Sequence, residues 1–446
     1  MGQIIIGDPI FIERRLTSRV NASKDLRKYL KNDELFIEYD DEIKVDNSIL
    51  NIPLTATVLP LAWLTGSDLH VSKLDKTFKE SMDKLQLVFK EIHPDIPFKT
   101  EIIANKLVDN RIKLDNTAQD VALLFSGGVD STYSMIRNLE QKPRLIMLWG
   151  VDDFPYPENS EQWNHIYEVY KKRAYRLGLN INLVKTNISQ IIYHKKINHN
   201  FHEMLHNGSV GALLQHSLPL LTPCAPLSFG RFRRLLIAAS SGTSYNFEKY
   251  PWGSSPLTDE TINWADLKVI HDGPIDRAEK ITGLIKEFHS SNPLQLRVCL
   301  CKLDKAILND STCEKCLRTI APLALAGIDP NTCGFNVDET SFNLLKEIIA
   351  DGGLSPVLID AHWIPIQKMI PKTLNHDFYG SMKFFEWFRE YDMLSVSKKL
   401  DLHRKIYHYL PFLLADLLDR FYQKIGLYIH EASPLRESEP KKNGLE

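Results

Sequence analysis

The sequence is poor in cysteine, in net charge and in long apolar runs. Only 6 of its 446 residues are cysteine, and all but one of these lie between residues 299 and 333. Thiols gathered in one short stretch do not make a disulfide framework that spans a chain of this length. The cysteine content therefore favours reduced or metal-bound thiols.

The near absence of net charge argues against a partner held by bulk electrostatics. Lys and Arg number 54 against 56 Asp and Glu, which gives a formal net charge of −2. A nucleic-acid partner is thus not indicated by charge. The local basic group Arg231, Arg233 and Arg234 is interpreted as solvated charge at the start of a strand.

Targeting and membrane signals are also missing. The N-terminal residues lack the charged start, the apolar stretch and the small-residue cleavage site of a secretory signal. The most apolar late segment, residues 409–428, carries Asp416, Asp419, Arg420 and Lys424, which makes it too polar to span a bilayer. We therefore expect a cytoplasmic protein without a membrane partner.

The chain instead has the composition of a multi-domain globular protein. Hydrophobic residues make up 43% and charged residues 25% of the sequence, and 446 residues exceed one ordinary core. We predict an α+β module over residues 1–115, with a helix at 72–92, and an α/β domain over 116–335. A helical region with aromatic-rich segments and a polar, disordered tail follows over 336–446.

The middle segment alternates apolar strand patterns with helical ones. Strands are expected at residues 120–125, 144–150, 179–185 and 233–239. This alternation predicts an α/β fold with a parallel sheet and helices on both faces. The carboxyl ends of its strands then form the edge at which such sheets bind ligands.

A glycine pair stands where the first of these strands meets a helix. Adjacent glycines let the backbone turn sharply, and the start of a helix offers unpaired N–H groups and a positive dipole to an anion. Hydroxyl groups beside the turn can bind phosphate oxygens, and Asp130 can hold Mg²⁺. The alternative is a tight turn in which Ser131 or Asp130 only caps the helix. The predicted nucleotide-binding residues are Ser126, Gly127, Gly128, Val129, Asp130, Ser131 and Thr132.

The run SGGVDS at residues 126–131 resembles the signature SGGxDS of the PP-loop (N-type) ATP pyrophosphatase superfamily. Groups with this signature include 7-cyano-7-deazaguanine synthase, the synthetase domain of asparagine synthetase, NAD synthetase and tRNA-thiolating enzymes. The resemblance implies a five-stranded parallel sheet of the adenine nucleotide alpha hydrolase type. It also implies that ATP is cleaved between its α and β phosphates, with AMP placed on a substrate oxygen.

Further site residues are expected along the same sheet edge. In the superfamily the end of the second strand lines the adenosine pocket, which points to Gly150 and Asp152. Small residues after a later strand, Ser240 and Gly242, allow a ligand to approach the backbone. Charge on the α-phosphate and on departing pyrophosphate needs cations. Arg277, Lys280, Lys315 and Arg318 are the candidates, with solvated helix charges as the alternative interpretation.

Four clustered cysteines predict a zinc site. Thiolates suit tetrahedral Zn²⁺, and a CxxC pair supplies two ligands from one turn. The deazaguanine synthase group carries a four-cysteine zinc site in the corresponding region, but this chain has Asp310 where a cysteine would precede Cys313 by three residues. Reduced buried thiols or a three-cysteine site remain as alternatives, with Cys333 as a spare ligand. The predicted ligands are Cys299, Cys301, Cys313 and Cys316.

Together these features predict an ATP-dependent ligase that resembles 7-cyano-7-deazaguanine synthase. It would use ATP, Mg²⁺ and Zn²⁺, and would activate a carboxylate or amide-type oxygen of a small molecule, modified base, peptide or protein for attack by ammonia, an amine or sulfide. Whether the chain forms a homo-oligomer is left open by the sequence. The alternatives are a tRNA-thiolating enzyme that uses a cysteine such as Cys224, a non-catalytic nucleotide-binding regulator, and a zinc protease suggested by the HExxH run at residues 202–206.

Overall fold

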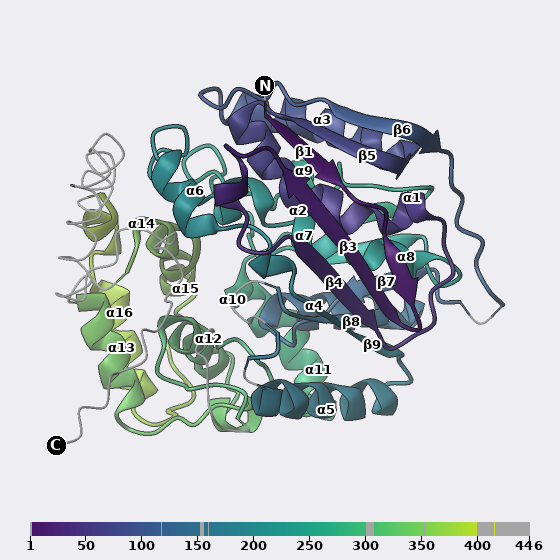
Figure 1. The fold of residues 1–446 in the computed structure, drawn as a ribbon. Coiled ribbons are helices and arrows are strands. Elements are labelled where there is room, and N and C mark those ends of the chain that lie inside the picture. Colours follow the sequence, from purple (N-terminus) through teal and green to yellow (C-terminus); the bar gives the residue numbers. More distant parts are fainter. Residues whose placement is uncertain are drawn as a thin grey trace, which may run out of the picture.

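The computed structural model describes residues 2–116, 118–151, 156–158, 160–299, 307–350, 354–398 and 414. They form an α/β structure built on one 11-stranded mixed sheet, in which most neighbouring strands are parallel (Figure 1). The strands lie in the order β11-β10-β7-β8-β9-β4-β3-β1-β5-β6, and β2 pairs with β3. The prediction of an α/β fold with a parallel sheet is confirmed at this level.

The strand bounds follow the apolar runs of the sequence. The strands are β1 (Gln3–Ile6), β2 (Ile10–Ile12), β3 (Arg15–Ala22), β4 (Glu34–Tyr39), β5 (Asp68–Asp75), β6 (Ile102–Val108), β7 (Val121–Leu124), β8 (Arg144–Trp149), β9 (Ile181–Thr186), β10 (Arg234–Ala238) and β11 (Lys268–Asp272). Each predicted strand of the middle segment thus overlaps an observed strand, with ends that differ by at most two residues.

The five strands β7 to β11 are mutually parallel and contain a reversal of strand order. From β7 the chain adds β8 and β9 on one side and then returns to add β10 and β11 on the other. The carboxyl ends of β7 and β10 therefore flank a topological switch point, where open α/β sheets hold their ligands. The glycine-rich turn at residues 126–131 follows β7 and lies at this point.

Helices cover both faces of the sheet. Successive side chains of a strand point to opposite faces, so the apolar strands leave an apolar surface on each face that helices bury. Ala122 of β7 packs in one core, while its neighbours Val121 and Leu123 pack in the other. The first core holds side chains of helix α2 (Ile52–Thr65), which is buried from Ile52 to Leu64, and of the amphipathic helix α3 (Lys76–Ile92). The second holds side chains of α4 (Val129–Arg137), α5 (Ser160–Arg176) and α12 (Glu314–Leu325).

The remaining helices are short or lie near the C-terminus. The α-helices are α1 (Asn47–Leu50), α6 (His194–Asn200), α7 (Leu218–Leu221), α8 (Cys224–Ser228), α9 (Pro256–Asp259), α10 (Arg277–Lys280), α11 (Lys286–Ser291), α13 (Ser341–Ala350), α14 (Pro356–Leu358), α15 (Ile364–Lys368) and α16 (Ser381–Glu390). Short π-helical turns run over Gly211–Gln215, Ile281–Ile285 and Ile359–Trp363.

The N-terminal strands continue the same sheet. β4 pairs antiparallel with β9, with Ile37 opposite Thr186. The predicted module at residues 1–115 therefore shares its sheet with the segment that follows, and the expected boundaries near 115 and 335 stay predictions. The predicted helix at 72–92 starts later, because residues up to Asp75 belong to β5 and the Asp75 carboxylate caps the helix at Phe78 N.

The region after residue 336 is helical where it is described. The aromatic-rich segment at 384–388 lies in α16, and Phe384, Phe385 and Phe388 are buried there as packing residues. The predicted tail and the stretch from 399 onward, apart from residue 414, lie outside the described residues. Within the described ranges, no helix has the length and apolar character needed to cross a membrane.

Candidate functional site

The turn after β7 presents the start of α4 without a side-chain cap. Gly128 is the residue before the helix, and no side chain accepts a hydrogen bond from the first helical turn. The N–H groups of that turn cannot pair within the helix. The Ser131 hydroxyl instead holds the turn together: it accepts from Ser126 N and donates to Gly128 O, both at 3.3 Å. This geometry suits an anion at residues 126–131.

Gly127 is required at its position for two reasons. Its φ of +78° is a left-handed conformation that favours glycine, and a Cβ there would lie 2.1 Å from Cζ of Tyr170. The Tyr170 hydroxyl donates to the Gly127 carbonyl at 3.1 Å, and burial raises the pKa of Tyr170, so it stays a donor. Tyr170, a side chain of α5, thus holds the turn at Gly127 in place.

Asp130 is clamped by two cations. Its Oδ2 accepts from Nε of Arg277 at 2.9 Å, and its Oδ1 accepts from Nζ of Lys280 at 2.8 Å. Burial would raise the pKa of the Asp130 carboxyl, but the charges and hydrogen bonds of Arg277 and Lys280 outweigh it and lower the pKa to about 2. Both carboxylate oxygens are engaged by positive groups, so Asp130 does not stand open to Mg²⁺ in this arrangement.

Lys280 links this clamp to the next strand of the sheet. Its side chain is 1% exposed, and Nζ also donates to the carbonyl of Ala239 at 2.6 Å, directly after β10. The clamp therefore joins α4, α10 and the carboxyl end of β10. Two predicted cations, Arg277 and Lys280, thus lie beside the turn that the sequence singled out.

The other two predicted cations lie on α12 close to the clamp. Burial and the charges of Arg277, Arg318 and Arg297 lower the pKa of Lys315 to about 8. Arg318 is 7% exposed and pairs with Glu314 through its Nε at 3.2 Å. All four predicted cations therefore gather at one place. Positive groups crowd there, as expected for a site that receives a polyanion.

His362 is a member of this cluster that sequence reasoning missed. It lies in the π-helical turn Ile359–Trp363, and burial together with Arg318, Arg277, Lys315 and Lys280 holds the pKa of His362 well below its usual value. His362, Arg277 and Arg318 line a small pocket of about 10 Å³ that is partly open to solvent. No motif surrounds His362, so only the packing of the C-terminal helices reveals it.

The remaining predicted nucleotide residues have mixed positions. Ser126 is exposed beside the turn, whereas Val129 is buried in the second core and Thr132 is fully buried, so their side chains do not face a ligand there. Gly150 follows β8 with a φ of +109°, and a Cβ there would lie 1.6 Å from Thr186 O. Asp152 lies outside the described residues.

The small residues after β10 pack against α10. Ser240 is partly buried beyond the strand end, and a Cβ on Gly242 would lie 2.0 Å from Oδ1 of Asp276, the residue before α10. Gly242 therefore lets the β10 loop approach the helix that carries Arg277 and Lys280. The role that the structure shows for Gly242 is this close approach of the loop to α10.

Three of the predicted zinc ligands lie together. The ligand atoms of Cys299, Asp310, Cys313 and Cys316 all lie within 4.8 Å of one another, a group that could hold a metal ion. Asp310 also accepts from the N–H of Cys313 at 3.1 Å, which positions its carboxylate beside that thiol. Cys301 lies outside the described residues. The fourth ligand in the described group is therefore a carboxylate that the sequence interpretation treated as a departure.

The HExxH run does not form the helical face that a zinc protease needs. Helix α6 ends at Asn200, and residues 201–207 form turns in which His206 has a φ of +48°. His206 Nε2 lies 2.9 Å from Oδ2 of Asp95. Cys224, the candidate for sulfur chemistry, is fully buried, and burial raises the pKa of its thiol.

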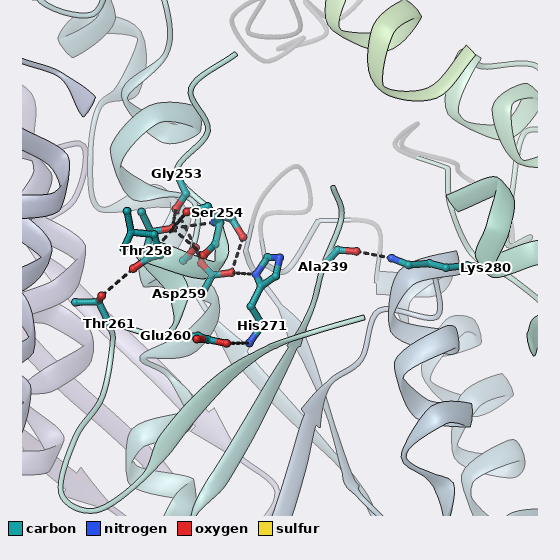
Figure 2. Close-up of polar contacts among 12 residues, drawn as sticks. Ala239, Gly253, Ser254, Thr258, Asp259, Glu260, Thr261, His271 and Lys280 are labelled. Atoms are coloured by element: carbon teal, nitrogen blue, oxygen red, sulfur yellow. Dashed lines mark hydrogen bonds and ion pairs between the residues drawn. The ribbon is translucent and has the colours of Figure 1, made fainter. Parts of the chain in front are cut away.

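A second polar cluster lies at the end of β11, across the sheet from the clamp (Figure 2). Nδ1 of His271 lies 2.7 Å from Oδ2 of Asp259, and the two side chains are 2% and 0% exposed. Ser254 also donates to Asp259 Oδ2 at 2.8 Å, and Ser217 donates to Oδ1. His271 lies in β11, and no pattern in the sequence connects it with Asp259.

Comparisons with known proteins leave this site to be interpreted from its own residues. No family model, curated protein or solved structure matches the chain.

Proposed function

We propose that the chain is an ATP-dependent adenylating ligase of the PP-loop ATP pyrophosphatase type, with the sheet β7–β11 as its adenine nucleotide alpha hydrolase-like core. It would cleave ATP to AMP and pyrophosphate. A carboxylate or amide-type oxygen of the substrate attacks the α-phosphorus, the bond to the β-phosphate breaks, and pyrophosphate leaves. Ammonia, an amine or sulfide then displaces AMP. The observation that carries the proposal is the uncapped SGGVDS turn at the topological switch point with four cations around it.

The position of each residue indicates its part in the proposed reaction. Backbone N–H groups of the turn would bind phosphate oxygens, and the start of α4 favours their negative charge. Arg277 uses Nε for Asp130, and its terminal nitrogens make no hydrogen bond among the described residues. A planar fork in this position is suited to phosphate oxygens. Lys280, Lys315 and Arg318 would offset the charge that builds on departing pyrophosphate.

Within the class, the structure favours C–N bond formation over sulfur transfer. The thiol of Cys224 is buried and protonated, because burial raises its pKa, and thiolate is the reactive form. The cysteine cluster has the donors of a structural metal site. We propose Zn²⁺ held by Cys299, Asp310, Cys313 and Cys316, directly at the start of α12 and hence beside Lys315 and Arg318.

Product analysis tests this function against a nucleotide-binding regulator. Purified protein, ATP labelled at the α-phosphate, Mg²⁺ and cell extract as a source of acceptor should yield labelled AMP together with pyrophosphate. Asp130→Ala should abolish this release. Asp120→Ala is the matched control, because Asp120 also pairs with two arginines, Arg233 and Arg234, but at the amino ends of the strands. ADP and orthophosphate as products, or nucleotide binding without turnover, would contradict the proposal.

A further inference from the structure

The Asp259–His271 pair is held in one geometry by its surroundings. Asp259 is the last residue of α9, whose start is fixed by a reciprocal capping box between Ser255 and Thr258. The backbone N–H of His271 in turn donates to Oε1 of Glu260 at 3.2 Å. A rigid helix and a strand thus set the 2.7 Å contact between the imidazole and the carboxylate.

The partners of Asp259 determine which nitrogen of His271 carries the proton. Asp259 accepts hydroxyl hydrogen bonds from Ser217 and Ser254, which stabilise an ionised carboxylate. An ionised carboxylate is an acceptor only, so Nδ1 of His271 must be the donor. With the proton on Nδ1, the second ring nitrogen, Nε2, lies on the far side of the ring from Asp259. This is the arrangement in which a carboxylate orients a histidine base and stabilises its protonated form.

Nε2 of His271 is buried and has no hydrogen-bond partner among the described residues. A buried polar atom without a partner lacks the hydrogen bond that water would give it, so a polar ligand atom placed beside it would be stabilised. On the other side of the ring, the Asp259 carboxylate has three hydrogen-bond partners, Ser217, Ser254 and His271. Nε2 is thus the nitrogen of this network that remains to accept a proton.

The dyad lies across the end of β10 from the Asp130 clamp. His271 pairs with Ile237 in the parallel register, and Ala239 N donates to the carbonyl of the next β11 residue at 2.8 Å. The Ala239 carbonyl accepts from Lys280. Figure 2 shows Ala239 between His271 on one side and Lys280 on the other. The dyad and the clamp therefore lie on opposite sides of the end of β10.

We propose that Asp259 and His271 form the proton-accepting dyad for the second step of the reaction, with ammonia as the nucleophile. This inference rests on the proposed function and assigns a role that function leaves open. Ammonia attacks the adenylated carbon, the bond from that carbon to the AMP oxygen breaks, and AMP leaves with the electron pair. Nε2 takes one proton from the attacking nitrogen, and Asp259 stabilises the imidazolium. Because Nε2 is covered, the geometry favours a small nucleophile over a bulky amine.

The two half-reactions separate a base from a structural residue. His271→Asn keeps an N–H donor for Asp259 and removes only Nε2. Exchange of labelled pyrophosphate into ATP, with cell extract as the acceptor source, reports the first half-reaction and should stay within about twofold of wild type. AMP release driven by ammonium should fall about 100-fold or more, the usual contribution of general-base catalysis. Hydroxylamine is a stronger nucleophile, and the nitrogen of its adduct is more acidic and loses its proton to water more readily, so it should restore most of the loss.

Asp259→Asn tests the same dyad from its other half and should show the same split between exchange and ammonium-driven release. Thr261→Ala is the matched control, because Thr261 is half-buried on the same segment and its hydroxyl donates to Leu257 O, away from the dyad. Equal losses of exchange and ammonium-driven release, or a loss that hydroxylamine does not restore, would overturn the dyad. Wild-type protein with no exchange at all would instead refute the proposed function and the dyad with it.

Discussion

Gly127→Ala should lower the free energy of unfolding more than alanine at Gly178 or at Gly128. The left-handed φ of +78° costs a residue with a side chain about 1–2 kcal/mol. The new Cβ would also lie 2.1 Å from Cζ of the fully buried Tyr170. Displacement of a packed ring by an added methyl typically costs about 1–3 kcal/mol more. The sum is a loss of about 2–5 kcal/mol in the free energy of unfolding.

Two other glycines isolate these contributions. Gly178 has a φ of +66° with nothing within 4 Å of its Cβ position, so Gly178→Ala measures the backbone cost alone. Gly128 has a φ of −74°, and its nearest Cβ contact is 3.4 Å, so Gly128→Ala should cost about 1 kcal/mol or less through a weaker helix cap. Urea titrations followed by tryptophan fluorescence measure all three. Equal losses for Gly127→Ala and Gly178→Ala would refute the reasoning about Tyr170.

Two further predictions concern metal and protons. Asp310→Ala should lower the zinc content measured by mass spectrometry, whereas Cys301→Ser should retain it; the reverse pattern would return the fourth ligand to cysteine. Asp130 has its pKa lowered from 3.8 to about 2 in the folded chain. A depressed pKa adds stability that is present above about pH 4 and is lost as the pH falls through 2, worth about 2 kcal/mol here. Asp130→Asn should flatten the pH dependence of the unfolding midpoint over this range; an unchanged slope would refute the clamp.

Local patterns were enough to predict the centre of the sheet. The predicted strands match β7, β8, β9 and β10 to within two residues. The strands β7, β8 and β10 lie in nearly continuous apolar runs, as buried parallel strands do, whereas β9 alternates buried and partly buried residues. The glycine pair likewise predicted a turn before a helix, since few other residues allow a φ of +78°. These features are encoded within a few residues of each other.

Features that depend on distant segments could not be predicted. The pairing of β4 with β9 joins residues that are far apart in sequence, and no periodic pattern of apolar residues indicates it. His362 reaches the cation cluster only through the packing of the C-terminal helices, and the contact of Asp259 with His271 joins the end of a helix to a strand. The sequence alone shows Asp310 only as a position where a cysteine is absent. Its place beside three thiols depends on the fold around Cys299.

The most direct test of the central claim is a crystal structure with an ATP analogue that resists cleavage between the α and β phosphates. The account predicts its phosphate chain on the backbone N–H groups of residues 126–131, within reach of Arg277 and Lys280. A nucleotide bound elsewhere, with this turn empty, would contradict it.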